Sequence, residues 1–489
     1  MTTDTVLEGA TDLVVVGAGP AGLAAAVTAL SYGLRVTLLD SGAEVGGQFW
    51  RHPPRGSGLP EWPEQHHDLQ TYRALRRHLD YHERGGRLRL MLGHHVWTAE
   101  RPAHATDGGM FTVHALDRSW APGAERAGLV RGRAMLVATG AFDRPLPFPG
   151  WDLPGVYTAG ALQALLKGNG VAAGSRVVVG GTGPFLLPVA VGLARAGARV
   201  AAVCEASAAT AWLPHLGAAA RVPAKLGEGA WYGAELARRR IPLLQRSAVV
   251  QAHGTDQVEA VTLMRIDSAG VAVPGSERTL EVDAVGVGWG FVPQLDLALT
   301  LAADVAPGSD GVETVTVDSA QDTTVPGLFA AGEVTGIGGA TLALAEGRIA
   351  GEAASAYLRA EGARGPGVAR RATRVVARHR AFAEGMARAH PVPAQILSGM
   401  PDDAVVCRCE EVTAEAVRSA IADGARGARQ VKQLTRAGMG WCQGRICTPA
   451  VECLLGAGRG MAVERLVATP VPLGALAALD EEQPDRTVM

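Results

Sequence analysis

The chain has 489 residues, enough for about three domains, and a formal net charge of −2. Glycine accounts for 63 residues, about twice the usual share, and 47% of the residues are hydrophobic. This balance excludes intrinsic disorder and gives no reason to expect nucleic acid or an anionic membrane as a partner. The sequence shows no basic segment leading into an apolar one, so we expect no signal peptide, no membrane span and a cytoplasmic location.

An apolar segment, Leu13 to Val16, runs directly into a glycine-rich turn and then into a helical sequence that ends near Tyr32. Glycines with this spacing allow a tight turn, close approach of a pyrophosphate and close packing of helix against strand. The next strand ends at Asp40, which is placed to accept a hydrogen bond from a ribose hydroxyl. The pattern predicts a dinucleotide site formed by Gly17, Gly19, Pro20, Ala21, Gly22 and Asp40.

Three further segments indicate that this dinucleotide is FAD. They are Gly46-Gly47-Gln48, Ala138-Thr139-Gly140 and, far downstream, Gly332-Glu333. In this order they resemble the two-dinucleotide-domain flavoproteins, the broad family that contains glutathione and thioredoxin reductases. The resemblance implies that the first segment lies along the pyrophosphate, that the second marks a crossing between domains, and that Glu333, in place of the usual aspartate, binds the ribitol. Arg51 follows the first segment and is a further candidate for contact with FAD.

A second strand-turn-helix unit lies between these FAD segments. Gly181 and Gly183 begin a similar turn, and the strand that follows the helix ends at Glu205. Leu186 stands where a third glycine or alanine is usual, so we expect its side chain to push helix and strand apart and to crowd a pyrophosphate. Three alternatives remain open for this unit: NAD(P), an adenine nucleotide such as ATP, or no ligand.

Disulfide reductases of this fold need a pair of redox-active cysteines beside the flavin. In this chain Phe49, Trp50 and Arg51 follow the Gly-Gly segment, and Cys204 in the second unit stands alone. The sequence therefore excludes disulfide reduction.

Four of the six cysteines form two close pairs near the C-terminus: Cys407, Cys409, Cys442 and Cys447. Such pairs hold tetrahedral zinc or an iron–sulfur cluster, and the single residue between the first two cysteines disfavours zinc. Thr413 is predicted to cap one helix and Thr448 another, which places Cys447 at a helix N-terminus. The surrounding sequence resembles the bacterioferritin-associated-ferredoxin-like (BFD-like) domain, which implies a [2Fe-2S] cluster, with zinc and an empty site as alternatives.

Several segments point to one family for the whole chain: Gly46 to Arg51, Ala138 to Trp151, Gly181 to Pro188, the four cysteines, and Pro470 to Gly474. From Asp12 to about Leu476 the order of parts is similar to the alpha, or A, subunit of heteromeric amino-acid and opine dehydrogenases. That family includes octopine and nopaline oxidases, dye-linked L-proline and hydroxyproline dehydrogenases, hydrogen cyanide synthase and the related sarcosine oxidase alpha subunit.

The resemblance implies an α/β fold with two Rossmann-like domains, as in disulfide-reductase-like flavoproteins, and a small helical [2Fe-2S] domain. The expected limits are 1–155 and 283–365 for the FAD-binding domain, 156–282 for the second nucleotide-binding domain, 366–400 for a helical linker, and 401–489 for the iron–sulfur domain.

In such complexes the amine or imino acid is oxidised in a smaller, flavin-containing beta subunit that resembles D-amino-acid oxidases. FMN can lie between the subunits, a small additional subunit can be present, and the alpha subunit passes electrons to an external acceptor. Because FAD takes up two electrons and a [2Fe-2S] cluster carries one, we expect an electron-relay subunit. The alternatives are a stand-alone NAD(P)H-dependent reductase and an assembly subunit whose cofactors are structural. No catalytic residue can be assigned from the sequence.

Overall fold

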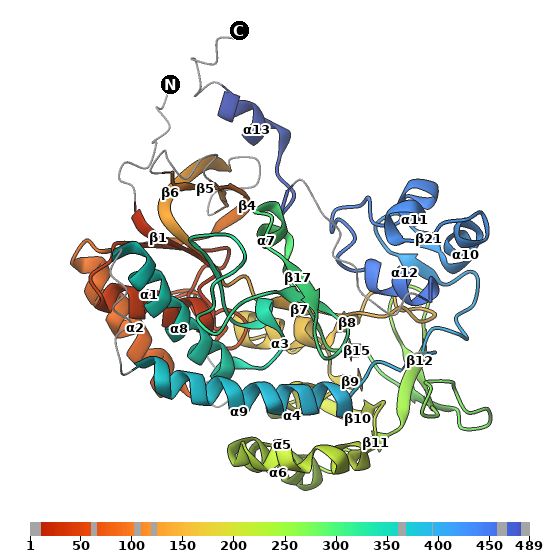
Figure 1. The fold of residues 1–489 in the computed structure, drawn as a ribbon. Coiled ribbons are helices and arrows are strands. Elements are labelled where there is room, and N and C mark those ends of the chain that lie inside the picture. The colour runs from red at the N-terminus through yellow and green to blue at the C-terminus, as the bar shows by residue number, and fades with distance from the viewer. Residues whose placement is uncertain are drawn as a thin grey trace.

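The computed structural model of the chain describes residues 11–59, 66–101, 109–118, 125–359, 368–393, 395–456 and 467–480. Two α/β units built on mostly parallel sheets lie next to each other, and a small helical unit near the C-terminal end of the chain packs against the second of them (Figure 1). None of the helices in the described ranges is long and apolar enough to cross a membrane.

The first sheet has the strand order β3-β2-β1-β6-β5-β4, and β19 also pairs with β6. Its strands are β1 (Thr11–Val16), β2 (Val36–Asp40), β3 (Leu88–Leu92), β4 (His94–Glu100), β5 (Phe111–Asp117), β6 (Arg126–Val137) and β19 (Leu328–Ala330). The strands β1, β2, β3, β6 and β19 run parallel, whereas β4, β5 and β6 form an antiparallel meander. The apolar run Leu13 to Val16 is buried on both faces, as expected for a strand inside a parallel sheet.

Helices cover both faces of this sheet. They are α1 (Pro20–Ser31), α2 (Leu69–Arg84), α7 (Asp296–Thr300) and α8 (Ala340–Arg359). The helices α1 and α8 approach closely because small residues face each other, and a β-carbon on Gly347 would overlap the carbonyl oxygen of Ala21. This contact holds the beginning of α1 in place. A short hairpin of β17 (Val305–Pro307) and β18 (Glu313–Val315) and the single turn η4 (Glu333–Thr335) complete the unit.

The second sheet is entirely parallel, in the order β11-β10-β9-β15-β8. Its strands are β8 (Val156–Thr158), β9 (Arg176–Gly181), β10 (Arg199–Glu205), β11 (Leu243–Gln245) and β15 (Ala284–Gly288). The associated helices are α3 (Ala159–Asn169), α4 (Leu186–Arg195), η3 (Ala209–His215), α5 (Leu216–Ala220) and α6 (Pro223–Arg238). The strands β12 (Ser247–His253), β13 (Ala260–Arg265) and β14 (Arg278–Glu281) form a separate antiparallel sheet.

The strand β15 corrects the expected domain limit at residue 282. It pairs with β8 and β9, so the second unit extends to Gly288. The chain crosses between the units twice, at β7 (Ala141–Asp143) and β16 (Phe291–Pro293), and these two strands pair antiparallel. Thr139 lies at the first crossing, where its hydroxyl donates to the carbonyl oxygen of Gln294 at 2.8 Å.

The helix α9 (Val368–Ala389) lies along α8 of the first unit and also contacts η3 and α5 of the second (Figure 1). The iron–sulfur unit follows, with β20 (Val405–Cys407), β21 (Val412–Thr413), α10 (Ala414–Ala422), α11 (Ala428–Thr435) and α12 (Thr448–Leu454). The last helix, α13 (Leu473–Asp480), lies apart from this unit, beside β4 and β6 (Figure 1). The amide of Ala468 donates to the carbonyl oxygen of Trp97 in β4 at 2.7 Å. This part of the expected iron–sulfur domain, 401–489, therefore packs against the first unit.

Candidate functional site

The turn between β1 and α1 has the backbone shape that a dinucleotide site requires. Gly17 has φ of +106°, and a β-carbon there would overlap the carbonyl oxygen of Ala138. A β-carbon on Gly22 would overlap the carbonyl oxygen of Gly17, so both positions accept only glycine. Within the described part of the chain, the amides of Gly19, Ala21 and Gly22 have no hydrogen-bond partner. Three free amides at a helix N-terminus fit a pyrophosphate.

Asp40 closes the same site at the end of β2. Its two carboxylate oxygens accept hydrogen bonds from the amides of Ala18 and Gly42, each at 2.6 Å. Burial raises the pKa of Asp40, and these two amide bonds oppose the shift. The carboxylate has lone pairs left after these two bonds, so it can also accept from a ribose hydroxyl.

The segment Gly46-Gly47-Gln48 lies directly against the first turn. Gly46 and Gly47 have positive φ, and a β-carbon on Gly47 would lie 2.8 Å from the Cα atom of Gly19. The structure thus brings together the two segments that the sequence predicts to border the pyrophosphate. Arg51 is held by Gln48, whose side-chain oxygen accepts from its Nε at 3.0 Å, and its chain packs over Gly168 of α3.

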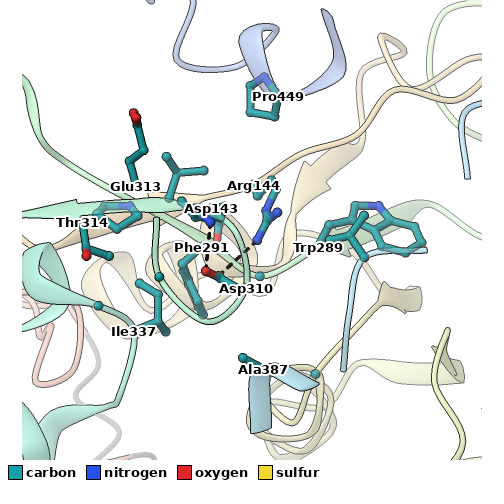
Figure 2. Close-up of a pocket in the computed structure, with 18 of the residues that line it drawn as sticks. Asp143, Arg144, Trp289, Phe291, Asp310, Glu313, Thr314, Ile337, Ala387 and Pro449 are labelled. Atoms are coloured by element: carbon teal, nitrogen blue, oxygen red, sulfur yellow. Dashed lines mark hydrogen bonds and ion pairs between the residues drawn. The ribbon is translucent and has the colours of Figure 1, made fainter. Parts of the chain in front are cut away.

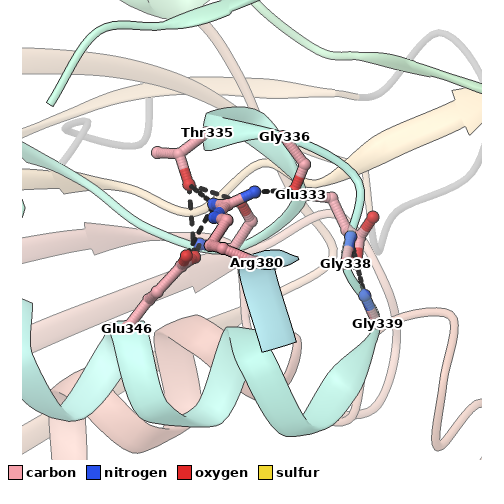
Figure 3. Close-up of polar contacts among 8 residues, drawn as sticks. Glu333, Thr335, Gly336, Gly338, Gly339, Glu346 and Arg380 are labelled. Atoms are coloured by element: carbon pink, nitrogen blue, oxygen red, sulfur yellow. Dashed lines mark hydrogen bonds and ion pairs between the residues drawn. The ribbon is translucent and has the colours of Figure 1, made fainter. Parts of the chain in front are cut away.

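Gly332 and Glu333 stand beside the beginning of α1, where a β-carbon on Gly332 would lie 2.8 Å from Cβ of Ala21. The Glu333 carboxylate points to the loop before α8 and accepts from the amide of Gly339 at 2.7 Å (Figure 3). Burial raises the pKa of Glu333, partly offset by the amides of Gly339 and Gly338. Glutamate is one methylene longer than the usual aspartate, which lets one carboxylate oxygen of Glu333 reach the loop before α8. The other oxygen accepts no hydrogen bond from the described residues and can take a ribitol hydroxyl.

The same loop is fixed by an ion pair that the sequence did not reveal. Arg380 of α9 donates to the carbonyl oxygen of Gly336 at 2.8 Å and to the Thr335 hydroxyl at 2.7 Å, and it pairs with Glu346 of α8 at 2.5 Å (Figure 3). Glu346 is 1% exposed, and burial raises the pKa of its carboxyl against the effect of Arg380. A helix from the linker thus holds the loop that carries Glu333.

The second glycine turn differs from the first in its helix. The helix α4 begins at Leu186, so Gly183, Pro184 and Phe185 form a turn before it. The amides of Leu186 and Leu187 donate to the carbonyl oxygens of Gly183 and Pro184, both at 3.2 Å, and the amide of Thr182 donates to that of Gly288 at 2.9 Å. Most amides that would bind a phosphate are therefore already paired.

Leu186 does not separate helix and strand as the sequence suggested. Its side chain is 1% exposed and lies in the core of the second unit. The helix α4 begins late, at Leu186, and the leucine side chain packs into this core. It therefore does not crowd the outer face of the turn.

Glu205, the acid of the second unit, accepts three hydrogen bonds from its own turn and a residue just after β10. Its carboxylate accepts from the amides of Gly183 and Ser207, each at 2.9 Å, and from the Thr182 hydroxyl at 3.1 Å. Nδ1 of His390, just beyond α9, lies 3.4 Å from the same carboxylate. The His390 ring is held in turn by the indole of Trp212, which donates to its Nε2 at 2.9 Å.

A cavity of about 870 Å³ lies where the two α/β units, α9 and the iron–sulfur unit meet. Phe185, Trp289 and Phe291 contribute aromatic surface, and Arg144 lies 3.6 Å from Asp310 across one wall (Figure 2). Pro449 of α12 and Ala387 of α9 approach the cavity from opposite sides (Figure 2). The cavity reaches Gly183 and has the size of a small-ligand pocket.

The four C-terminal cysteines converge in two pairs. The thiol of Cys407 hydrogen-bonds with that of Cys447, and the thiol of Cys409 with that of Cys442. The Cys447 contact and the amides of Gly438, Glu410 and Cys409 lower the pKa of Cys407 to about 5. Within the described residues, no set of three or more histidine, cysteine or acidic side chains converges as the ligands of one metal ion do. Two thiol pairs fit a two-iron cluster, which takes two thiolates on each iron.

The helices around the cysteines follow the sequence prediction with one exception. The Thr413 hydroxyl accepts from the amide of Ala416 at 3.3 Å and caps α10 as expected. Thr448, however, is the first residue of α12, and Cys447 occupies the cap position. The helix begins one residue earlier than expected, and Pro449 stands at its second position, where proline is tolerated. Cys447 still lies at the helix N-terminus.

The iron–sulfur unit shares a hydrophobic core with the second α/β unit. Leu146, Ala248 and Trp289 pack with Val406, Val417 and other apolar residues of the iron–sulfur unit. The indole of Trp151 donates to the carbonyl oxygen of Val405 at 2.6 Å, and the Arg408 guanidinium stacks over the Trp151 ring at 5.0 Å. The cluster ligands are thereby held in a fixed position relative to the second unit.

Comparisons with known proteins agree with this architecture. Residues 11–350 match the family model of pyridine nucleotide-disulphide oxidoreductases, and residues 405–457 match that of the BFD-like [2Fe-2S] binding domain. These two models establish the disulfide-reductase-like fold and imply FAD and a [2Fe-2S] cluster as cofactors.

Two curated relatives cover most of the chain. The A subunit of opine oxidase from Agrobacterium tumefaciens strain Ach5 is 33% identical over 90% of this chain and 84% of its own length. The HcnB subunit of hydrogen cyanide synthase from Pseudomonas protegens is 30% identical over 96% of this chain and 98% of its own length. The crystal structure of L-proline dehydrogenase from P. horikoshii shares the fold, with a TM-score of 0.65, 18% identity, and coverage of 96% of this chain and 79% of that one.

Proposed function

The chain belongs to the pyridine nucleotide-disulphide oxidoreductase family, in the branch that contains HcnB and the A subunit of opine oxidase, and we propose that it is an electron-transfer subunit of a heteromeric amino-acid, imino-acid or opine dehydrogenase. In this proposal a flavin-containing beta subunit oxidises the substrate, and this chain passes the electrons to an external acceptor. FAD exchanges electrons in pairs or singly and a [2Fe-2S] cluster carries one at a time, so together they connect the two kinds of carrier.

The observation that carries this proposal is the contrast between an open first turn and a closed second turn. The free amides of Gly19, Ala21 and Gly22 support a bound dinucleotide, whereas Glu205 and the second turn satisfy each other. A chain that does not take hydride from NAD(P)H needs another electron donor, and in this proposal the beta subunit is that donor. The names of the relatives, which are subunits of larger enzymes, support this interpretation.

Residues of this chain would hold each cofactor in place. The first turn, Asp40, the Gly46-Gly47 segment and Glu333 would bind FAD, and Arg380 fixes the loop of Glu333. Cys407, Cys409, Cys442 and Cys447 would hold the cluster, with the amides of Gly438 and Glu410 directed at the Cys407 sulfur. The docking of Val405 and Arg408 on Trp151 keeps this ligand set from moving relative to the second unit.

One observation favours the alternative, a stand-alone NAD(P)H-dependent reductase. The cavity of about 870 Å³ runs from Gly183 to Thr335 and Ile337 in the loop after Glu333, so a ligand in it would connect the second turn with the FAD groove. The engaged Glu205 and the paired amides of the second turn weigh against a nucleotide in that position.

The proposal is tested by adding candidate amino acids, imino acids and opines anaerobically to the chain alone and to its complex with a co-expressed beta subunit. We expect the electron paramagnetic resonance signal of a reduced cluster only in the complex. A Cys442→Ser variant of this chain in the same complex is the control, because substrate should still bleach flavin while the cluster signal is lost. Reduction of the chain alone by any of these substrates would contradict the proposal.

A further inference from the structure

Lys167, in the last turn of α3, is a buried lysine without an acidic partner. The residue is only 7% exposed, and its Nζ donates to the carbonyl oxygen of Phe49 at 3.4 Å. No carboxylate among the described residues forms an ion pair with it or shifts its pKa, which burial alone lowers to about 8. A buried ammonium that is satisfied only by a neutral carbonyl is unfavourable unless an anion approaches.

The groups around Lys167 add positive rather than negative charge. His66 and His67 are close enough for Lys167 to lower the pKa of each ring, and burial with Lys167 brings the pKa of His66 to about 4. Arg51 packs its side chain over Gly168, the next residue of α3. Glu228 of α6 is the acidic group that acts on His67, and it does not shift the pKa of Lys167.

The carbonyl that Lys167 contacts belongs to Phe49, next to the segment expected to border the pyrophosphate. Phe49 directly follows Gly46-Gly47-Gln48, and Gly47 lies against Gly19 of the first turn. Lys167 itself is carried by the second α/β unit, whose helix α3 follows β8. The contact with Phe49 thus brings a cation from the second unit to this segment of the first.

We propose that Lys167 is a positioning residue of the FAD site, supplied by the second unit, whose ammonium group offsets negative charge on the bound dinucleotide. This inference rests on the proposed location of FAD in the groove of the first turn. It also gives the second unit a use that does not require a nucleotide of its own. The negative charge belongs either to the pyrophosphate or to the reduced flavin, and the experiment separates these two sources.

The chain has only three lysines, Lys167, Lys225 and Lys432, which makes the test direct. Lys167→Met removes the charge and keeps an apolar chain of similar length, and Lys167→Arg restores a cation. Lys225→Met is the matched control, because Lys225 pairs with Glu228 at 2.7 Å on α6. For each variant we would measure the dissociation constants of FAD and ADP by fluorescence and the reduction potential of the bound flavin.

We expect Lys167→Met to weaken FAD binding about tenfold or to lower the flavin reduction potential, with recovery in Lys167→Arg and no change in Lys225→Met. An equal loss for ADP and FAD assigns the charge to the pyrophosphate, and a lower potential with unchanged ADP binding assigns it to the reduced flavin. A folded Lys167→Met protein with unaltered affinities and potential would overturn the inference.

A second measurement covers the case in which Lys167→Met fails to fold. Reductive methylation with ¹³C-formaldehyde labels the three lysines of the unmutated protein, and nuclear magnetic resonance then follows each pKa. The Lys167 pKa should rise when FAD binds, and an unchanged pKa at full FAD occupancy would refute the inference. Failure of the proposed function looks different, because NADH, NADPH or an amine substrate would then reduce the chain alone, whatever the effect of Lys167→Met on FAD affinity.

Discussion

The two glycine turns of this chain share a sequence pattern and differ in what their polar groups contact. In the first, α1 begins at Pro20 directly after Gly19, and three amides face outward without partners in the described chain. In the second, α4 begins at Leu186, and most amides of the turn are paired, with carbonyls of the turn, with Gly288 of β15 or with the carboxylate of Glu205. The comparison teaches that a Rossmann-type turn binds phosphate through free amides, which the spacing of glycines alone does not guarantee.

The largest effect is expected from breaking the first turn. Gly22→Ala places a methyl group on the carbonyl oxygen of Gly17, so α1 must move away from β1 and the free amides lose their common direction. We expect FAD affinity to fall about a hundredfold or more, measured by flavin absorbance after dialysis. The control is Gly183→Ala in the second turn, where a methyl group meets nothing within 4 Å. That variant should keep its FAD and lose about 1 kcal/mol of stability because Gly183 has φ of +97°.

The second prediction concerns the residue that replaces the third glycine. Leu186→Ala should lower the free energy of unfolding by about 2 to 5 kcal/mol, because the leucine is buried in the core of the second unit. Urea titration followed by circular dichroism measures this loss. FAD content and NADH affinity should not change, and a gain of NADH binding would show that Leu186 itself, rather than the paired amides, closes the second turn.

The third prediction uses pH to probe a histidine beside the first turn. His66, near Phe49, has a pKa lowered from 6.5 to about 4 by burial and by Lys167. Because the unfolded chain binds this proton first, the contribution of His66 to stability is complete above pH 6.5 and is lost as the pH falls toward 4. The loss amounts to at most about 3 kcal/mol. Unfolding of His66→Gln should depend less on pH in this window, whereas His78→Gln, at an exposed position of α2, should behave as wild type.

The smallest effect is expected for the pair that closes the second turn. His390→Ala should cost about 1 kcal/mol, because Glu205 keeps its three hydrogen-bond donors while Trp212 loses its acceptor. A double-mutant cycle with Glu205→Gln, measured by urea unfolding, isolates the coupling energy between His390 and Glu205. We also expect this energy to be about 1 kcal/mol. A coupling energy of zero would mean that His390 only lies near Glu205 and does not help to close the site.

Short-range features of both turns follow from the sequence, and long-range pairs do not. Three features depend on residues close in the chain or on a recognisable motif: the strands and helix around Gly17 to Gly22, the cap at Thr413, and the pairing of the four cysteines. By contrast, Arg380 pairs with Glu346 only because α9 packs against α8. From its sequence alone, an arginine-rich helix such as α9 is expected to face solvent. The return of residues 467–480 to the first sheet has no local signal either.

The domain limit near residue 282 and the effect of Leu186 show why such predictions fail. β15 resembles any short apolar strand, and only its pairing with β9 assigns it to the second sheet. Leu186 belongs to a core that also contains Leu162 of α3 and Tyr232 of α6, and this clustering cannot be seen in one sequence. Both errors come from packing between segments that are distant in the chain.

The most direct test of this account is an anaerobic titration of the purified chain with NADH and NADPH, followed by dithionite, while absorption of the flavin and the cluster is recorded. A closed second turn predicts that neither nucleotide bleaches these bands and that dithionite bleaches both. Prompt bleaching by NADH or NADPH would contradict the account and would make the chain a reductase in its own right.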